Sequence, residues 1–440
     1  MKKRDRRLER SLVSEALPYY VFDEYGVRPG TITGMVNTFE GRGSTYDYVV
    51  GDPAAFRKRI EFYKPIGAEY LICNGASFFL VEAPEYQLYG AEWESLPGVR
   101  YPNYGGLQFT GVNVCPRSSF ADYYLWWLKR LIEEYDIGGI YLDMTGATGC
   151  SNKYHGCGGW KNGEWRSTAD LFALRNFYKR FYTFLKEEGR KRGREFYVVQ
   201  HSSIYANIPF VDHVFKGEGW AAVDENLWDN LTPTYFRAFE NQRPIAANYT
   251  FYPMVSQPFY RAAKKWATPG DLLSRTLIHD VLCWATSGFH KEISPVWNAW
   301  EDFEIEDATW VPYYANDPRV QTTSDQLLVS FYTNEDKAIF VVANQTPNRI
   351  SATLKLDRRG LGLPSGALPA RDILGGQTTH EGHINEDTLF DGRRLDEIHH
   401  SSDKYRYPSR SVPAGQPSVL EGDEFPLEVG SRDLLVLRVN

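Results

Sequence analysis

Two carboxylates follow apolar runs at the points where a buried strand would end. Asp143 comes directly after Ile137–Leu142, and Glu218 lies in the glycine-flanked sequence KGEGW after Val211–Phe215. Hydrolysis of a glycosidic bond needs two such groups a few ångströms apart: one protonates the leaving oxygen while the other attacks the sugar or activates water. Asp143 and Glu218 are therefore a candidate catalytic pair. The alternatives are that Asp143 caps the next turn and that Glu218 binds a sugar hydroxyl or an arginine.

Further polar and aromatic residues recur at the predicted ends of other strands. Sugars present hydroxyl groups that polar side chains bind and flat C–H faces that stack on aromatic rings. His201 would bind a hydroxyl, tune a neighbouring carboxylate or be a buried structural histidine, and any single tryptophan could instead pack in a core. The candidate substrate-binding residues are Asn74, Asn113, Arg117, His155, His201, Trp220, Asn248, Trp284 and Trp297.

The loop CSNKYHGCGGW, from Cys150 to Trp160, carries a second candidate chemistry. Cys150, His155 and Cys157 could be three zinc ligands with an open fourth position. Structural zinc sites usually pair one Cys-x₂₋₄-Cys with another such pair, and no partner pair is evident. We therefore expect a disulfide between Cys150 and Cys157 or a loop that contacts substrate, and we expect no metal and no cofactor.

The elements that must position these residues alternate between apolar runs and amphipathic stretches. Near-continuous apolar runs are typical of strands buried on both faces, and strand–helix alternation predicts a parallel sheet. Eight strands predict a (β/α)₈ barrel, whose active site lies at the carboxyl ends of its strands. Residues 118–136 and 168–193 are predicted helices, and the strands are expected within 31–39, 69–77, 109–116, 137–144, 196–203, 211–220, 244–250 and 281–289.

The composition changes after about residue 320, where short alternating runs are separated by turn residues. This pattern is typical of a β-sandwich. We expect an N-terminal extension over 1–30, a catalytic α/β barrel over 31–318 and a C-terminal all-β sandwich over 319–440. The polar stretch 372–417 is predicted to be a long excursion from that sandwich.

Charge and hydropathy exclude several function classes. The 440 residues carry a formal net charge of −7 with scattered basic residues, which argues against a nucleic-acid partner. No stretch approaches the roughly 18 apolar residues of a membrane span. The start, MKKRDRRLER, lacks the apolar run of a signal peptide, so we expect a cytoplasmic chain unless it is a fragment of an exported protein. The oligomeric state is left open.

Several of these segments together resemble a known family. The stretch VNVCP, an aromatic-rich helix, GGIYLDMTG and CSNKYHGCGGW are similar to barrel domains grouped near glycoside hydrolase family 123, over roughly residues 60–300. The resemblance implies a bacterial glycosidase acting on a poly- or oligosaccharide. Family 123 enzymes use an adjacent Asp-Glu pair for substrate-assisted cleavage, but Met144 follows Asp143 here. The spacing of Asp143 and Glu218 looks more like barrel glycosidases with an Asp nucleophile and an acid/base two strands later.

Three hypotheses follow from the sequence. The first is a retaining glycoside hydrolase with Asp143 as nucleophile and Glu218 as acid/base, acting on a carbohydrate substrate. The second is a catalytically silent barrel that binds carbohydrate, which predicts an aromatic groove with no second carboxylate near Asp143. The third is a metal-dependent hydrolase that uses Cys150, His155 and Cys157, which predicts stoichiometric zinc.

Overall fold

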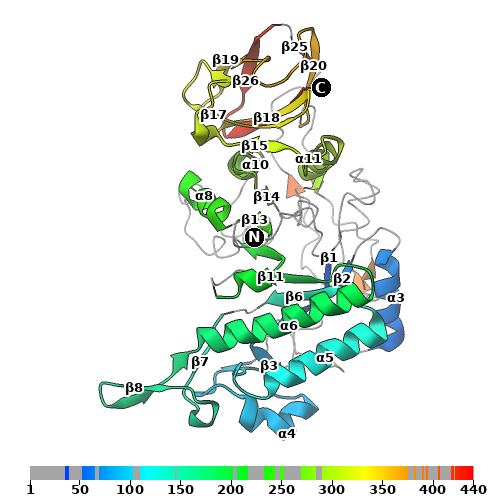
Figure 1. Ribbon diagram of the computed structural model, residues 1–440, viewed down its shortest axis with the longest axis vertical. Coiled ribbons are helices and arrows are strands. Elements are labelled where there is room, and N and C mark those ends of the chain that lie inside the picture. Colours follow the sequence, from blue (N-terminus) through cyan, green and yellow to red (C-terminus); the bar gives the residue numbers. More distant parts are fainter. Residues whose placement is uncertain are drawn as a thin grey trace.

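The computed structural model describes most of the chain in segments. These are residues 35–38, 52–64, 69–102, 110–143, 146–201, 206–216, 232–242, 248–251, 269–283, 290–374, 381–382, 389–390, 393–394, 405–406, 418–420 and 422–439. An α/β part in the first three quarters of the chain is followed by an all-β part (Figure 1). This order confirms an α/β fold with a C-terminal β domain.

A parallel sheet of seven strands forms the centre of the α/β part. Its order is β1 (Met35–Thr38), β2 (Glu69–Gly75), β6 (Gly139–Asp143), β11 (Tyr197–His201), β12 (His213–Lys216), β13 (Asn248–Phe251) and β14 (Leu282–Cys283). Each strand pairs with its neighbours in parallel. Within the described residues β1 and β14 are the two edges of the sheet, and seven of the eight predicted runs supply its strands.

The eighth predicted run, 109–116, is not a strand of this sheet, which corrects the prediction. Its strand β5 (Gly111–Asn113) lies between β3 (Phe78–Leu80) and β4 (Arg100–Tyr101) in a separate antiparallel sheet. Burial of Val112 and Val114 gives the run the same apolar character that a strand buried in the main sheet would show. Hydrophobic character alone does not distinguish the two settings.

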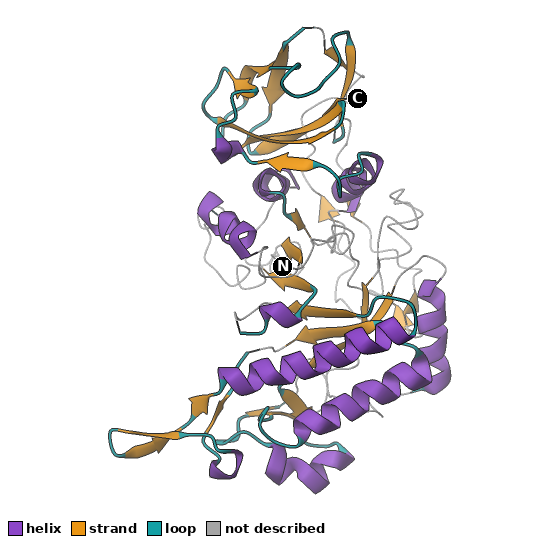
Figure 2. Cartoon of the chain, in the orientation of Figure 1, coloured by secondary structure: helices purple, strands orange, loops and turns teal. Residues whose placement is uncertain are grey.

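Helices cover one face of the parallel sheet (Figure 2). The described helices are α3 (Pro53–Tyr63), α4 (Pro84–Trp93), α5 (Phe120–Tyr135), α6 (Leu171–Lys191), α8 (Pro233–Gln242), α10 (Pro269–Thr276) and α11 (His290–Asp302). The predicted apolar face of α5 is confirmed, since Tyr124, Trp127, Leu128 and Leu131 are buried. The helix ends at Tyr135, one residue before the end of the predicted range, and Asp136 is in the left-handed conformation.

Alternation along the strands gives the sheet two distinct faces. Ile72, Ile140 and Val198 pack into the large core with the helices, whereas Cys73, Tyr141 and Val199 belong to a separate cluster on the opposite face. Gly139 begins β6 at φ +150°, and a Cβ there would lie 2.1 Å from the Tyr197 carbonyl oxygen. Glycine therefore permits the close approach of β6 to β11.

An insertion follows β6 at the carboxyl end of the sheet. It contains β7 (Gly149–Cys150), a 3₁₀ turn at Lys153–His155, the hairpin β8 (Gly159–Lys161) and β9 (Glu164–Arg166), and β10 (Thr168–Ala169), which pairs with β7. Asp170 then caps α6, because its carboxylate accepts a hydrogen bond from the Ala173 backbone N–H at 2.8 Å. The hairpin projects from the body of the molecule (Figure 1).

Two antiparallel sheets face each other in the C-terminal part. The larger contains β15 (Thr309–Val311), β17 (Leu327–Asn334), β18 (Lys337–Asn344), β27 (Asp433–Val439), β20 (Leu368–Asp372) and β25 (Ser418–Leu420). The smaller contains β16 (Val320–Thr322), β19 (Ile350–Leu356) and β26 (Glu424–Val429). Both sheets contribute to one core, for example through Phe340 and Leu354, as in a β-sandwich.

The sandwich begins before the predicted boundary at 318, because β15 already pairs with β17. Most of the predicted excursion 372–417 lies outside the described residues. Within it the structure has four short strands: β21 (Glu381–Gly382), β22 (Leu389–Phe390), β23 (Arg393–Arg394) and β24 (Tyr405–Arg406).

The larger sheet of the sandwich also packs against the α/β part. Phe340 and Val342 point into the sandwich core, whereas Ile339 and Val341 belong to the same cluster as Trp300 of α11. The buried Tyr332 hydroxyl donates to the Asp280 carboxylate at 2.6 Å across this boundary. The two parts therefore share a core and meet through a hydrogen-bonded, apolar interface.

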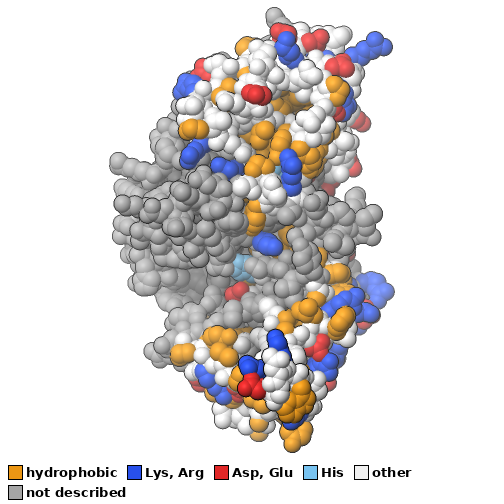
Figure 3. Space-filling model, turned by 90° about the vertical axis from the view of Figure 1, so that its left-hand side faces the viewer, with side chains coloured by type: hydrophobic (Ala, Val, Ile, Leu, Met, Phe, Trp, Pro, Cys, Tyr) orange, Lys and Arg blue, Asp and Glu red, His pale blue; other side chains and the backbone are white. Residues whose placement is uncertain are grey.

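On the face drawn in Figure 3, basic and acidic side chains of the described residues are interspersed at both ends of the molecule. In the described part of the chain no helix combines the length and the apolarity that crossing a bilayer requires.

Candidate active site

Asp143 and His201 lie side by side at the carboxyl ends of two neighbouring strands. The Asp143 Oδ1 is 3.4 Å from the His201 Nδ1, and 28% of the Asp143 side chain is exposed against 11% of that of His201. Strand β11 is paired in register with β6, which brings the last residue of each strand to the same end of the sheet. A histidine N–H beside a carboxylate favours its ionised form and fixes its orientation.

Successive side chains of a strand point to opposite faces of the sheet, so the positions of the polar residues along β2 and β6 show which face each occupies. Asp143 shares its face with Tyr141, whose ring lies 6.3 Å from that of His201. Asn74 follows Cys73 and is therefore on the opposite, helix-covered face, where its exposed fraction is 0%. The prediction that Asn74 binds sugar is corrected on this ground, because a side chain buried beneath the helices cannot reach a ligand at Asp143.

Asn248 lies at the wrong end of the sheet to meet Asp143. It is the first residue of β13 and pairs with His213, which is the first residue of β12. The predicted strand within 244–250 in fact begins at Asn248 and runs on to Phe251, so the residue taken as a strand end is a strand start. This prediction is therefore also corrected.

Two of the remaining candidates form structural contacts. The Asn113 Nδ2 donates to the Tyr101 hydroxyl at 3.0 Å within the small antiparallel sheet. Arg117 pairs with Asp170 at the start of α6, and although burial favours the neutral acid, the Ala173 backbone N–H and Arg117 hold the pKa of Asp170 below its usual value.

Trp297 is 1% exposed and packs inside the large core from α11. The prediction that it stacks on sugar is wrong for this structure, because a fully buried indole presents no face to a ligand. Glu218, Trp220 and Trp284 lie outside the described residues.

His155 faces cysteines rather than an open groove, which corrects its prediction as a sugar-binding residue. Its Nδ1 is 3.6 Å from the Cys150 Sγ, and Cys115, Cys150 and Cys157 form one buried cluster around it. Cys150 and Cys157 are free thiols, so the expected disulfide between them is not present. Cys115 is a member that sequence reasoning missed, because it lies far from the loop along the chain.

Lys216, the last residue of β12, was also not singled out from the sequence. Burial lowers the pKa of its ammonium group. It lies two positions before Glu218 in the chain. A desolvated lysine at a strand end is a feature that the charge pattern of the sequence does not reveal.

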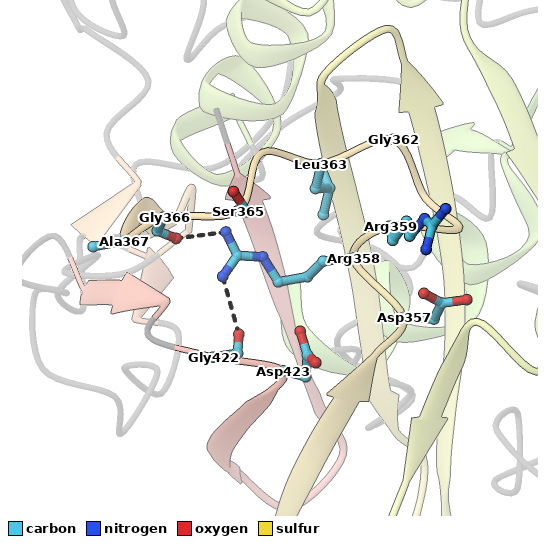
Figure 4. Close-up of a pocket in the computed structure, with 10 residues that line it drawn as sticks. All are labelled: Asp357, Arg358, Arg359, Gly362, Leu363, Ser365, Gly366, Ala367, Gly422 and Asp423. Atoms are coloured by element: carbon cyan, nitrogen blue, oxygen red, sulfur yellow. Dashed lines mark hydrogen bonds between the residues drawn. The ribbon is translucent and has the colours of Figure 1, made fainter.

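A hollow in the C-terminal sandwich offers a different setting. It is lined by residues 357–359, 362–363, 365–367 and 422–423. Figure 4 shows the Arg358 side chain crossing it to the Gly366 and Gly422 carbonyl oxygens, at 2.5 and 3.3 Å. Arg358 is 7% exposed, and these contacts connect the loop after β19 to the turn before β26.

A model of a known protein family matches the C-terminal part of the chain. Residues 292–388 match the model described as glycoside hydrolase 123, C-terminal domain. No protein of curated function matches the chain in sequence.

Solved structures share the fold across nearly the whole chain. A noncanonic maltogenic alpha-amylase from Thermotoga neapolitana is 11% identical, with a TM-score of 0.53 over 98% of this chain and 99% of that one. An alpha-amylase from Anoxybacillus is 8% identical, with a TM-score of 0.50 over 93% and 87%. Residues 292–388 therefore resemble a glycoside hydrolase 123 C-terminal domain, and the chain as a whole shares the fold of these two amylases.

Proposed function

We propose that the protein hydrolyses a poly- or oligosaccharide with retention of configuration, using Asp143 as nucleophile and Glu218 as acid/base. The observation that carries the proposal is the Asp143–His201 pair at the carboxyl ends of β6 and β11. Functional groups of α/β barrels lie at that end of the strands. The proposal includes closure of the parallel sheet into such a barrel.

The position of Glu218 in the chain supports its role. It follows Lys216, the last residue of β12, and β12 is separated from β6 only by β11. Residues just past β6 and β12 therefore start from strand ends that share one end of the sheet. Retention requires the two carboxyl groups to be about 5–5.5 Å apart, whereas roughly 6.5–9.5 Å favours inversion.

Each group would perform one task in each half of the reaction. The Asp143 carboxylate attacks the anomeric carbon while Glu218 protonates the departing glycosidic oxygen, which leaves a covalent glycosyl ester on Asp143. Glu218, now ionised, takes a proton from water, and that water cleaves the ester to release the sugar and restore both carboxyl groups. His201 holds Asp143 in the ionised state that attack requires.

The contacts to sugar that remain in the proposal are Trp220 and Trp284, which would offer aromatic faces for stacking. The experiment described next tests the role of Asp143 and does not depend on either tryptophan.

The test is hydrolysis of a panel of aryl glycosides and polysaccharides by the wild type and by Asp143→Asn. We expect the variant to lose on the order of 10³-fold or more in kcat/KM with its thermal unfolding unchanged. Asp136→Asn is the matched control, because Asp136 precedes the same strand at its other end and should retain activity.

Full activity in Asp143→Asn would overturn the assignment of the nucleophile. If the wild type cleaves no member of the panel, the hypothesis of a catalytically silent carbohydrate-binding barrel is favoured. Retarded migration of the protein through gels containing the same polysaccharides would then support that hypothesis.

A further inference from the structure

Four potential metal ligands from two segments that are distant in the chain lie close together. They are Cys115, Cys150, His155 and Cys157, and their ligand atoms all lie within 4.8 Å of one another. Cys115 follows β5, whereas the other three belong to the insertion after β6. All four are buried, with exposed fractions of 1, 2, 8 and 3% in chain order.

We propose that these four residues bind one structural zinc ion in a closed Cys₃His site. The proposal is independent of the glycosidase mechanism. It also differs from the metal-dependent hydrolase considered from the sequence, because Cys115 fills the position that three ligands would have left open. A zinc ion with four protein ligands has no place for a reacting water or substrate.

The distances between ligand atoms support tetrahedral coordination. Zn–S bonds of about 2.3 Å at tetrahedral angles separate two sulfurs by about 3.8 Å. The Sγ atoms of Cys115 and Cys157 are 3.6 Å apart, and the Cys150 Sγ is 3.6 Å from the His155 Nδ1. The most distant pair of ligand atoms would move closer by about 1 Å on binding.

Contacts around the cluster orient its members as a zinc site requires. The His155 Nε2 lies 2.5 Å from the Glu92 carbonyl oxygen, an atom that only accepts, so Nε2 carries the hydrogen. The Asn152 Nδ2, 3.3 Å from the same nitrogen, does not change this assignment. Nδ1 is then left with its lone pair toward the cysteines. Metal-binding histidines usually donate their other ring N–H in this way.

Backbone contacts hold the sulfur ligands as well. The Asn152 N–H points to the Cys150 Sγ at 3.4 Å, a contact suited to a thiolate. The Cys115 N–H donates to the Trp93 carbonyl oxygen at 2.8 Å, and the Ser151 N–H donates to that of Leu96 at 2.7 Å. Gly156, at φ +67°, makes the turn between His155 and Cys157 and lies against Arg117, whose charge offsets the net negative charge of three thiolates and one Zn²⁺.

Two simpler interpretations of the cluster explain fewer of these contacts. Three buried thiols alone would form an ordinary apolar pocket, but such a pocket does not need a histidine nitrogen aimed at it. A Cys115–Cys157 disulfide would need the sulfurs at about 2.05 Å and would leave Cys150 and His155 without a role.

A zinc ion here would fasten the insertion after Asp143 to the small antiparallel sheet. That insertion carries the hairpin with Trp160, which is 70% exposed and packs edge-to-face against Trp165 with the ring centroids 5.7 Å apart. Binding energy at a structural zinc site contributes directly to folding of the segments it joins. Loss of the ion should therefore loosen residues 146–170 first.

Elemental analysis of the untagged full chain tests the proposal. We expect one zinc per chain in the wild type and in Cys73→Ala, whose thiol is buried in another cluster. Cys115→Ser and Cys157→Ser should each fall to about 0.1 zinc per chain or less, because three ligands hold structural zinc poorly. Chelation should speed proteolysis within 146–170 by roughly 10-fold, with other sites unchanged.

If the serine variants do not fold, X-ray absorption spectroscopy of the zinc in the wild type tests the proposed ligand set. Three sulfurs at about 2.3 Å and one nitrogen at about 2.0 Å are expected around zinc. Iron in place of zinc, a chain lighter by two hydrogens from a disulfide, or a metal-free protein whose three cluster thiols all react with a thiol reagent would each overturn the proposal.

Discussion

The two ends of the parallel sheet arrange charged residues in different ways. At the amino end, Arg194 binds two carboxylates: its Nη2 lies 2.8 Å from the Asp136 Oδ1 and its Nη1 lies 3.1 Å from the Glu69 Oε2. At the carboxyl end, Asp143 and His201 are 3.4 Å apart and part of the carboxylate is open to solvent. The same strands β2, β6 and β11 supply both ends.

This difference indicates that the two ends of the sheet have different roles. A bidentate arginine between two carboxylates locks the strand starts together, and its side chain is 28% exposed. An accessible carboxylate with a longer histidine contact leaves room for a ligand. We therefore expect the charged residues at the amino end to contribute to stability and those at the carboxyl end to contribute to catalysis, which is the arrangement found in α/β barrels.

After Asp143→Asn, the largest effect at the carboxyl end is expected from Glu218→Gln. Without a proton donor, kcat/KM on substrates with poor leaving groups should fall about 10²- to 10⁴-fold. Aryl glycosides with good leaving groups need no protonation, so their glycosylation step should be nearly unaffected. The ratio of the two losses measures the acid role directly.

Glu225→Gln is the matched control, since it makes the same chemical change in the polar sequence that follows. Addition of azide should restore turnover of activated substrates by Glu218→Gln and yield a glycosyl azide of retained configuration. An equal loss on both kinds of substrate, with no rescue by azide, would remove Glu218 from the acid/base role.

A smaller effect is expected from His201, which acts through Asp143. His201→Phe keeps a ring beside Tyr141 but removes the N–H, so the Asp143 carboxylate loses a contact that favours its charge. We expect kcat/KM to fall about 10- to 100-fold and its acidic limb to move to higher pH. The measurement is a pH profile of kcat/KM.

His201→Asn separates positioning from packing, because its amide nitrogen can take the place of Nδ1. This variant should recover most of the activity and the wild-type acidic limb. If His201→Asn and His201→Phe are equally impaired with unshifted profiles, His201 has only a structural role.

Local patterns in the sequence predicted much of this architecture. The apolar run before Asp143, the amphipathic face of α5 and the alternation in the sandwich each depend on neighbours in the chain, and the structure has all three. Predictions failed where tertiary packing, and not the local sequence, determines the environment of a residue. Val112 and Val114 are buried in the antiparallel sheet as thoroughly as they would be in the parallel one, and Asn74 and Trp297 are polar or aromatic residues that packing has buried.

The cysteine cluster is a second case in which local sequence patterns were not sufficient, because they did not identify one of its members. The loop from Cys150 to Cys157 supplied three ligands at plausible spacing, and the fourth is Cys115, which follows β5 in the small antiparallel sheet. The hydrogen bond from the Cys115 N–H to the carbonyl oxygen of Trp93, the last residue of α4, helps to hold it there. No spacing rule along the chain connects residues joined by such a tertiary contact.

The smallest effect, and the one that tests the amino end, is expected from Arg194→Met. Removing the cation leaves Glu69 and Asp136 facing each other, which should cost about 1–3 kcal/mol at neutral pH with kcat unchanged. In the wild type, burial raises the pKa of Glu69 even though Arg194 acts in the opposite direction. Without Arg194 that pKa rises further.

The sign of the pH dependence follows from this shift. A carboxyl group with a raised pKa in the folded state penalises folding when it is ionised, so the penalty is full above the folded pKa and vanishes below the unfolded value of 4.5. The urea midpoint of Arg194→Met should therefore lie furthest below that of the wild type near pH 8 and approach it near pH 4. In the double variant Glu69→Gln/Arg194→Met the gap should vary less with pH. A gap that is the same at both pH values would mean that Arg194 stabilises the strand starts through packing of its side chain and not through its charge.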